Sequence, residues 1–376
     1  MKKIYFWAPY NSKIGTINSV INSIRSIKKY SSKDIKPYLL DTTSEWKNYI
    51  NEYDIIFLRK NSFDFRNLKN KGFFWSRLFY IRIFLSCFFP LKSLLQRDKP
   101  DYLIVHLITS LPLIIFYLFN WKTKLILRIS GEPNLNIFRK ILWKLCASKI
   151  YKITCPSPET KQQLTKSKIF NYNQIEVLLD PVINIQNIIN KKETHIDDFY
   201  KKNCFILSIG RLTRQKNFNF LIEAYNKLLI IKPNIKLVIL GEGEEKSKLN
   251  KLIYDKSLRK NIFLLGNEEN VFKYMKHAYC LILPSLYENP GHVLIEAAAC
   301  NCPIISSNCP TGPSEFLDYG KGGFLFDVNN QQDFLDKFKL FVKQTKIEKL
   351  NKLIISKKKS LNYTLFRHFI SLKKII

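Results

Sequence analysis

Acidic residues are scarce in this sequence. Its 376 residues include 30 Asp and Glu against 61 Lys and Arg, which gives a formal net charge of +31. A basic excess of this size indicates an anionic partner such as nucleic acid, a membrane surface or a phosphorylated substrate. A composition rich in Lys, Ile and Asn throughout would give part of the same excess as an ordinary solvated surface. Both interpretations stay open on charge alone.

Paired cysteine spacings are missing as well. Eight cysteines are scattered along the chain, several of them inside apolar runs, and this pattern excludes a disulfide framework. We therefore expect reduced core cysteines in a cytosolic protein. Cys300, Cys302 and Cys309 form a cluster, but no CxxC pair and no nearby pair of histidines completes a zinc set.

Long uninterrupted hydrophobic runs are also lacking. The basic N-terminus has only a short apolar run before Pro9, which favours a first β-strand over a signal peptide or a spanning helix. Residues 73–95 are apolar and aromatic, but Arg77, Arg82 and Pro90 interrupt them. This interruption argues against a membrane span. An amphipathic helix lying in the membrane interface and a core helix with two exposed arginines fit equally well.

The chain does contain regular alternation of strand-like and helix-like segments. Its length favours two domains. The alternation predicts, in each half, a parallel sheet with helices on both faces. The strand-like runs of the first half are KIYFW, YLL, DIIFL, DYLIVHL and KLILRIS, and those of the second half are CFILSIG, KLVILGEG, NIFLLG, YCLILP, PIISS and GGFLF. The polar stretch 177–192, after Asp180-Pro181, is the expected boundary.

Unusual residues follow several strands of the second half, where ligands of open α/β sheets bind. Gly210 ends a strand, and Arg211 and Lys216 precede the next helix, a pattern typical of an anion site. Gly241 and Gly243 permit close backbone approach. The segment LLGNEEN ends a further strand, and a flat base could lie against its backbone.

Two glutamates flank a Pro-Gly step in the stretch SLYENPGHVLIEAAACNCPII. Glu288 follows a strand, Gly291 opens the next helix and Glu296 lies in the second turn of that helix. The helix N-terminus could face a phosphate, and the two carboxylates suit hydroxyl groups of a sugar and a ribose. Taken alone, Glu288 could equally be an exposed turn residue, and Glu296 could be a partner of the helix dipole.

These stretches, in this order and spacing, resemble a known family. The segments GRLTRQKNFNFLIEAY, LVILGEGEEKSKL, LPSLYENPGHVLIEAAACNCPIISSNCPTGPSEFL and GGFLF look like the C-terminal half of the retaining GT-B-fold glycosyltransferases (family 4, group 1). Within that family they are most similar to bacterial enzymes of lipopolysaccharide, O-antigen and capsule synthesis. The resemblance is specific over 204–327. It implies an α/β GT-B fold, with two doubly wound Rossmann-like domains facing a central cleft.

The resemblance also implies a domain division. Residues 1–182 would bind the acceptor, residues 183–360 would bind the nucleotide sugar, and residues 361–376 would form a C-terminal helix crossing back to the first domain.

The resemblance implies a role for each motif residue. Arg211, Lys216 and Glu288 would be catalytic: the cations would hold the donor diphosphate in place of a metal, and Glu288 would bind the donor sugar. Glu296 would bind the ribose. Further donor-binding residues would be Gly15, Thr16, Gly210, Gly243, Leu265, Gly266, Asn267, Pro290, Gly291, His292 and Val293. Many relatives read Glu-Gly-Phe-Gly where this chain has Glu288-Asn289-Pro290-Gly291.

The first domain offers fewer signals. Gly15-Thr16 matches the Gly-rich first loop of the family, although relatives often have a glycine pair there. His106 ends a strand at the expected cleft edge, where a structural histidine is the alternative. Ser130 and Glu132 lie where some relatives carry a cleft histidine after the next strand.

The resemblance therefore implies a metal-independent hexosyltransferase without a cofactor, and the sequence has no Asp-x-Asp pair of the metal-dependent kind. Its partners would be a nucleotide-sugar donor, a lipid-linked or oligosaccharide acceptor and an anionic membrane surface, at the cytoplasmic face of the cell membrane. A nucleotide-sugar epimerase or hydrolase of the same fold is the alternative. A basic nucleic-acid-binding protein is a third reading, but it does not explain the Glu-x7-Glu pattern.

Overall fold

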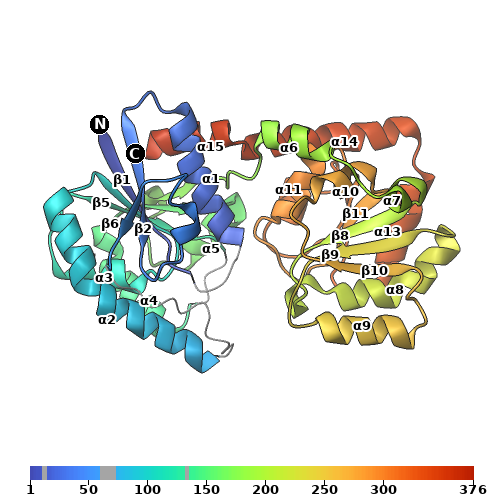
Figure 1. Ribbon diagram of the computed structural model, residues 1–376, viewed down its shortest axis with the longest axis horizontal. Coiled ribbons are helices and arrows are strands. Elements are labelled where there is room, and N and C mark those ends of the chain that lie inside the picture. Colours follow the sequence, from blue (N-terminus) through green and yellow to red (C-terminus); the bar gives the residue numbers. More distant parts are fainter. Residues whose placement is uncertain (11–14, 60–72, 132–134) are drawn as a thin grey trace. The chain divides into compact units, whose positions relative to one another are not determined.

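The computed structural model describes residues 1–10, 15–59, 73–131 and 135–376. The described chain divides into two compact units. The first contains Met1–Pro181 together with Leu365–Ile376, and the second contains Val182–Thr364. Figure 1 shows a sheet with flanking helices in each unit. The predicted α/β fold of two doubly wound domains is confirmed, because every strand pair in both sheets is parallel.

The first unit is built on a sheet whose described strands have the order β3-β2-β1-β4-β5-β6-β7. These strands are β1 Lys2–Trp7, β2 Ile35–Asp41, β3 Ile55–Phe57, β4 Tyr102–Val105, β5 Lys124–Arg128, β6 Ile150–Cys155 and β7 Ile175–Val177. The helices are α1 Gly15–Tyr30, α2 Phe73–Asp98, α3 Ser110–Leu118, α4 Ile137–Cys146, α5 Pro158–Lys166 and α15 Leu365–Ile375, with single turns at Lys47–Tyr49, Ala147–Lys149 and Tyr172–Gln174.

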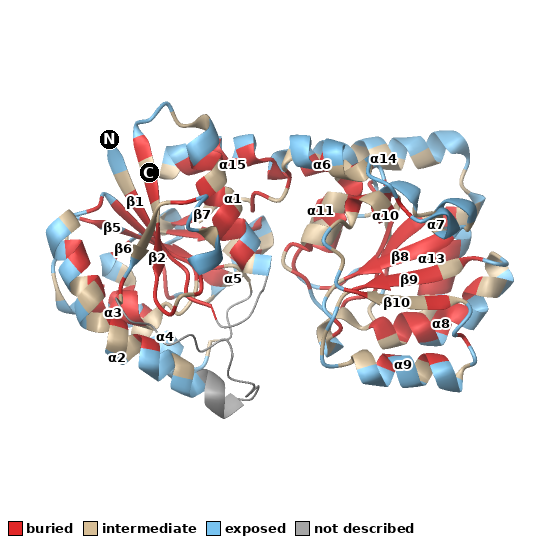
Figure 2. Cartoon of the chain, in the orientation of Figure 1, coloured by how far each residue is buried: buried red, intermediate tan, exposed pale blue. Residues whose placement is uncertain are grey.

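Alternate residues of β1 point into two different cores. Ile4 and Phe6 pack with the apolar residues of α1 and α15, while Tyr5 and Trp7 pack with those of α2 and α3. This is the pattern expected when helices cover both faces of a parallel sheet. Figure 2 shows the strands of both units as mostly buried. The C-terminal helix α15 thus completes one face of the first unit.

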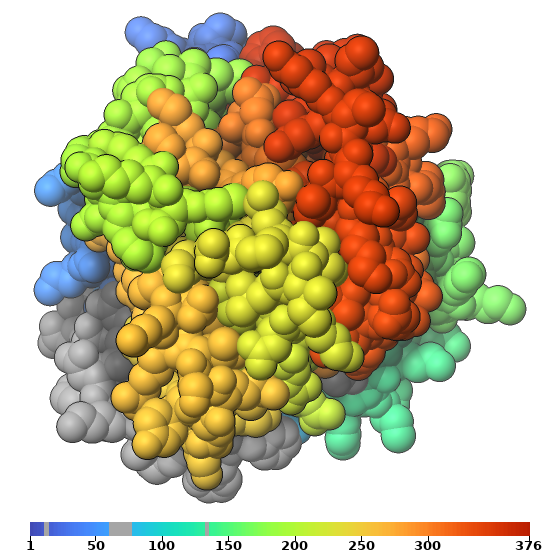
Figure 3. Space-filling view, turned by 90° about the vertical axis from the view of Figure 1, so that its right-hand side faces the viewer, coloured from blue at the N-terminus to red at the C-terminus, as the bar shows by residue number. Residues whose placement is uncertain are grey.

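The second unit has a sheet whose described strands have the order β10-β9-β8-β11-β12-β13. These strands are β8 Phe205–Ile209, β9 Lys236–Leu240, β10 Ile262–Gly266, β11 Cys280–Leu283, β12 Ile304–Ser307 and β13 Phe324–Phe326. Its helices are α6 Ile185–Lys192, α7 Asp198–Lys202, α8 Phe218–Ile231, α9 Lys246–Asp255, α10 Phe272–His277, α11 His292–Ala299, α12 Pro313–Phe316, α13 Gln331–Lys343 and α14 Lys346–Ser360, with single turns at Arg214–Lys216 and Leu361–Tyr363. Figure 3 looks onto this unit, with α14 in red on its surface.

The apolar segment 73–95 lies in helix α2, which continues through Pro90 instead of being broken there. By length and composition alone, its part Arg77–Asp98 could cross a membrane, contrary to our expectation from the sequence. Its Ile83, Cys87 and Leu91 are fully buried in the core of the first unit, as in a domain helix. Its opposite face is exposed and largely apolar, with Leu78, Ile81, Leu85 and Phe89 in contact with solvent.

The cysteines are free, and seven of the eight are buried as predicted. Cys204 is exposed, so the expectation of a core cysteine is wrong there. It immediately precedes β8, where the chain enters the sheet from the surface.

Candidate functional site

The strand order of the second unit fixes where a ligand can approach. Strand β8 lies between β9 and β11, and the chain proceeds outward from β8 to β10 before crossing to β11. The loops after β8 and β11 therefore leave the sheet at its topological switch point, where open α/β sheets bind ligands. These loops, Gly210–Asn217 and Pro284–Gly291, contain six of the residues predicted from the motifs: Gly210, Arg211, Lys216, Glu288, Pro290 and Gly291.

Hydrogen bonds of backbone and amide groups join these two loops. The amide of Leu286 donates to the carbonyl oxygen of Gln215 at 2.8 Å, and the Gln215 side chain donates to the carbonyl of Tyr287 at 2.9 Å. Asn217, in the left-handed conformation with φ 54°, donates through its side chain to the carbonyl of Pro284 at 3.2 Å. The loops are thus held in a fixed register across the switch point.

This register brings together two of the predicted catalytic residues. Lys216 Nζ lies 2.5 Å from Glu288 Oε1, and Ser285 Oγ donates to the same oxygen at 2.6 Å. Glu288 is 4% exposed, and Thr311 Oγ1 donates to its carbonyl oxygen. A carboxylate this deeply buried needs a paired charge and hydrogen bonds. In this structure Glu288 therefore holds Lys216 in place.

Arg211 differs from Lys216. It is exposed, and no ion pair joins it to any residue that the structure describes. Arg211 and Arg214 are thus the exposed cations in the loop after β8, and Arg211 directly follows Gly210.

Two glycines let the neighbouring loops pack closely. A Cβ atom on Gly241 would lie 1.9 Å from the carbonyl oxygen of Gly210, and one on Gly243 would lie 2.3 Å from that of Leu212. Gly243, predicted to bind the donor, thus has its Cα against protein backbone. Because Gly243 has no side chain, the loop after β8 can pack directly against it. The amide of Gly241 also donates to the carbonyl of Gly266 at the end of β10.

The residues beside Gly266 differ in exposure. Leu265 is partly buried and Asn267 is exposed at the end of β10.

Helix α11 begins as predicted, with Gly291 at its N-cap in the left-handed conformation, φ 85°. Pro290 is buried, while His292 and Val293 in the first turn are partly buried. Gly312 lies so close that a Cβ atom on it would come 2.5 Å from the carbonyl oxygen of Pro290. The loop after β12 thus supports the start of the helix.

Glu296 lies one turn further along α11, partly buried. No hydrogen bond or ion pair of its carboxylate is found within the described chain. Burial raises its pKa to about 7, and nearby His292 opposes this rise. A carboxyl group of this kind is a suitable partner for the hydroxyl groups of a ligand.

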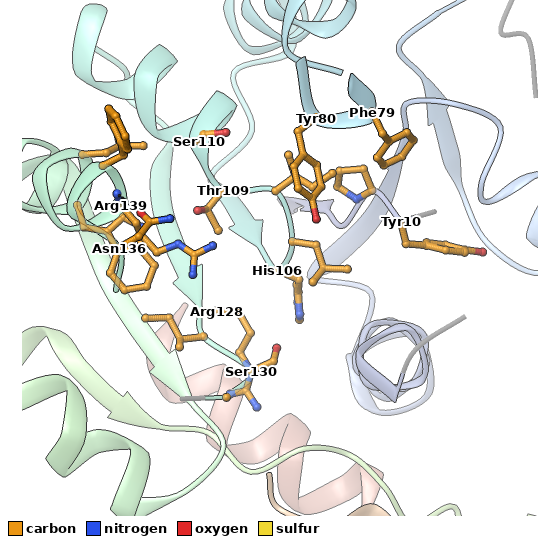
Figure 4. Close-up of a pocket in the computed structure, with 18 of the residues that line it drawn as sticks. Tyr10, Phe79, Tyr80, His106, Thr109, Ser110, Arg128, Ser130, Asn136 and Arg139 are labelled. Carbon is orange, nitrogen blue, oxygen red and sulfur yellow. Dashed lines mark hydrogen bonds between the residues drawn. The ribbon is translucent and has the colours of Figure 1, made fainter. Parts of the chain in front are cut away.

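In the first unit the predicted residues are more dispersed. Gly15 and Thr16 begin α1, where Gly15 is exposed and Thr16 is partly exposed. Glu132 lies outside the described residues. His106 and Ser130 follow β4 and β5, and both line a cavity of about 790 Å³, shown in Figure 4.

His106 is 9% exposed, and neither ring nitrogen has a hydrogen-bond partner in the described structure. Burial, helped by the charge of Arg128, lowers its pKa to about 3. Arg128 is itself buried and paired with Asp180 at 2.7 Å. His106 is therefore a neutral polar group in the wall of the cavity.

Sequence reasoning missed several residues of these sites. Ser285 and Thr311 fix Glu288, but small hydroxyl residues in loops give no signal by themselves. The amide atoms of Asn289 are buried without a hydrogen-bond partner among the described residues. The departure of this position from the family pattern was the available signal. The Arg128–Asp180 pair joins residues 52 apart, and no local pattern indicates it.

The chain is similar in sequence to known glycosyltransferases. Residues 190–360 match the model of the family described as glycosyl transferases group 1. An uncharacterized glycosyltransferase of Methanocaldococcus jannaschii is 32% identical over 248 residues, which are 61% of each chain. The N-acetylgalactosamine-N,N'-diacetylbacillosaminyl-diphospho-undecaprenol 4-alpha-N-acetylgalactosaminyltransferase of Campylobacter jejuni is 31% identical over 243 residues, 62% of this chain and 65% of that protein. The matches thus span less than two thirds of these relatives.

Solved structures show the same fold over the whole chain. A glycosyltransferase from Rickettsia africae superposes with a TM-score of 0.79 at 17% identity, covering 100% of this chain and 97% of that one. A protein from Anabaena, solved in complex with UDP and glucose, has a TM-score of 0.72 at 14% identity and covers 100% and 99%.

Proposed function

We propose that this chain, whose residues 190–360 match the model of the glycosyl transferases group 1 family and which has the GT-B fold, is a retaining hexosyltransferase. It would move a sugar from a nucleotide-sugar donor to a glycan acceptor in cell-surface polysaccharide synthesis. The observation that carries this proposal is the Lys216–Glu288 pair, held beside Arg211 and the start of α11 at the switch point of the second unit.

The donor diphosphate would bind Arg211, Lys216 and the N-terminal amides of α11. Both cations belong to the loop after β8, and Gly291 leaves the helix start without a side chain. Cations and free amides at a helix start favour phosphate oxygens. Glu296 would accept hydrogen bonds from the ribose, and the base would lie near Leu265–Asn267.

The role of Glu288 follows from its partner. Because its carboxylate is bonded to Lys216 and Ser285, its main contribution would be to hold Lys216 against the leaving diphosphate. Asn289, with an unpartnered amide, is the better candidate for a contact with the transferred sugar.

The chemistry needs positioning and charge stabilisation rather than a protein nucleophile. The acceptor hydroxyl would attack on the face that the diphosphate leaves, and a phosphate oxygen would take its proton, so that the anomeric configuration is retained. Arg211 and Lys216 would stabilise the negative charge that develops on the leaving group. We propose that these cations make a metal ion unnecessary.

The acceptor would be lipid-linked, at the cytoplasmic face of the membrane. The relative from Campylobacter jejuni acts on a sugar carried by diphospho-undecaprenol, and a Rhizobium meliloti relative acts in lipopolysaccharide core synthesis. The exposed apolar face of α2 supports a peripheral contact with the bilayer.

A two-stage assay tests the proposal. Nucleotide sugars are first screened by thermal shift, where a ligand at 100 times its dissociation constant stabilises the fold by about 2.7 kcal/mol. The donor found is then incubated with lipid-extracted acceptors in excess chelator, and the product's anomeric configuration is determined by NMR. Transfer with retention is the expected result. Inversion, or turnover that stops on chelation and returns with a divalent ion, would contradict the mechanism.

A further inference from the structure

Gln215 and Lys216 are neighbours on the single turn Arg214–Lys216, yet their side chains bond to different groups of the loop after β11. The Lys216 ammonium bonds to the Glu288 carboxylate, whereas the Gln215 amide donates to the carbonyl oxygen of Tyr287 at 2.9 Å. Tyr287 directly precedes Glu288 in the chain. One turn therefore holds both the side chain of Glu288 and the peptide group that comes before it.

The backbone of Glu288 is also held by the loop after β12. Its amide donates to the carbonyl oxygen of Pro310 at 3.3 Å, and Thr311 Oγ1 donates to its carbonyl oxygen. Of the described side chains in the loop after β8, Gln215 is the one that bonds to the peptide group between Tyr287 and Glu288. Gln215 therefore sets the backbone of Glu288 against the loop that contains Lys216.

The other contacts between the loops after β8 and β11 involve earlier residues of the second loop. The carbonyl oxygen of Gln215 accepts from the amide of Leu286 at 2.8 Å, and the Asn217 side chain donates to the carbonyl oxygen of Pro284 at 3.2 Å. Neither bond depends on the Gln215 side chain. Removing that side chain should therefore loosen the contact beside Glu288 while the two loops stay joined.

We propose that Gln215 is a positioning residue for the transfer reaction. Its amide fixes the peptide group before Glu288, Glu288 fixes Lys216, and Lys216 then faces the leaving diphosphate without reorganisation. The position of such a charge matters steeply, because a displacement of about 1 Å lowers a rate by up to about a hundredfold. This assignment rests on the proposed function, because it takes Lys216 as a cation that stabilises the leaving group.

Two substitutions separate the hydrogen bond of Gln215 from its size. Gln215→Glu keeps the length of the side chain but places a carboxylate, which only accepts hydrogen bonds, against a carbonyl oxygen. Gln215→Ala removes the contact altogether. Because the bond lies at the surface, water can replace the lost donor in both variants. Their thermal midpoints should therefore fall by no more than about 2–4 °C.

Acetylation of lysine side chains, measured by mass spectrometry, tests the position of Lys216 without any substrate. The Lys216 side chain is 17% exposed and paired in the parent, so it should react slowly. Both Gln215 variants should raise its rate at least about threefold, in the same direction as Glu288→Gln. Lys357, an exposed lysine of α14, should react at the parent's rate in every variant. Gln332→Ala, at a surface glutamine of the same unit, is the matched control.

Kinetics with the nucleotide sugar that the parent uses test the effect on transfer. Both Gln215 variants should lower kcat about tenfold, while the affinity for the free nucleoside diphosphate changes less than about twofold. A double variant of Gln215→Ala with Glu288→Gln should lose less than the product of the two separate losses, because both changes act through Lys216. A general structural defect would make the two losses multiply.

Parent rates of acetylation and of turnover in both Gln215 variants would overturn the inference. Losses that multiply in the double variant, or a loss of nucleotide affinity equal to the loss of kcat, would also overturn it, because Gln215 would then act apart from Lys216. If the variants release Lys216 but the parent turns over no nucleotide sugar, the contact between Gln215 and the Lys216–Glu288 pair stands and the proposed function fails.

Discussion

Lys216 Nζ and Glu288 Oε1 lie 2.5 Å apart although 72 residues separate them in the chain. The pair joins the loops that leave β8 and β11, and Ser285 completes the bonding of the shared carboxylate oxygen. A partly buried cation such as Lys216 is fixed in direction by such a partner, and it loses that direction when the partner is neutralised. The pair therefore makes the position of Lys216 dependent on Glu288.

Replacing Glu288 should lower turnover more than nucleotide binding. Glu288→Gln keeps the shape but removes the charge that orients Lys216, so we expect kcat to fall about thirty- to 160-fold, a loss of about 2–3 kcal/mol. The free nucleoside diphosphate should bind nearly as well as to the parent. Steady-state kinetics and calorimetry measure both quantities. Glu223→Gln, on the exposed side of α8, is the surface control. Equal losses of kcat and nucleotide affinity would contradict the orienting role.

Glu296→Gln should have the opposite effect. Hydrogen bonds from the ribose to a carboxylate persist from ground state to transition state, so their loss should mainly raise the donor KM. The pKa of Glu296, raised to about 7 by burial, adds a pH signature. The carboxylate forms as the pH rises, so donor affinity should increase about tenfold between pH 6 and pH 8 in the parent. If the donor affinity of Glu296→Gln depended on pH as that of the parent does, Glu296 would not be the group that binds the ribose.

Gly241 should not tolerate a side chain. The Cβ atom of Gly241→Ala would come 1.9 Å from the carbonyl oxygen of Gly210, so the loops after β8 and β9 must separate. We expect a loss of about 1–3 kcal/mol in the free energy of unfolding, together with weaker nucleotide binding. Gly320→Ala is the control, because Gly320 also has a positive φ but no atom within 4 Å of the added Cβ. Similar losses in the two variants would show that backbone conformation, rather than loop packing, sets the cost.

His106 should make the protein less stable in mild acid. Its pKa, lowered to about 3 by burial, lies below the ordinary value of 6.5, so the unfolded chain takes up a proton first as the pH falls. The stability contributed by neutral His106 is thus full above about pH 6.5 and is lost progressively toward pH 3. Between pH 7 and pH 5, the parent should lose about 2 kcal/mol relative to His106→Asn.

Chemical denaturation of the two proteins at each pH measures this difference. His195→Asn, at an exposed histidine, is the matched control for the substitution. A constant difference for His106→Asn as well would show that His106 is protonated in the folded protein.

The exposed face of α2 should bind anionic membranes. Leu85 and Phe89 are 71% and 72% exposed, and Leu85→Ser and Phe89→Ser should each weaken vesicle binding about tenfold. Nearby cations should add about 1 kcal/mol each on anionic vesicles at low salt. Ile230→Ser, at an 83% exposed residue of the second unit, is the matched control. If equal amounts of the protein floated with neutral and with anionic vesicles, the electrostatic part of the prediction would be wrong.

The sequence determined the parts of this protein that depend on neighbours along the chain. The alternation of strand and helix predicted both parallel sheets, because side-chain periodicity and turn residues act locally. The start of α11 at Gly291 and the loop after β8 could be placed for the same reason. The motifs of residues 190–360 also match the model of the glycosyl transferases group 1 family.

The tertiary structure decided which of the loops after the strands lie side by side. Strand order placed β11 beside β8, and only this order made Lys216 the partner of Glu288. It also showed that Gly243 serves loop packing, that α15 packs on the first unit, and that α2 has one buried and one apolar exposed face. These contacts join residues far apart in sequence. Local patterns cannot specify them, because a parallel sheet pairs strands through long crossovers whose order depends on the packing of the whole domain.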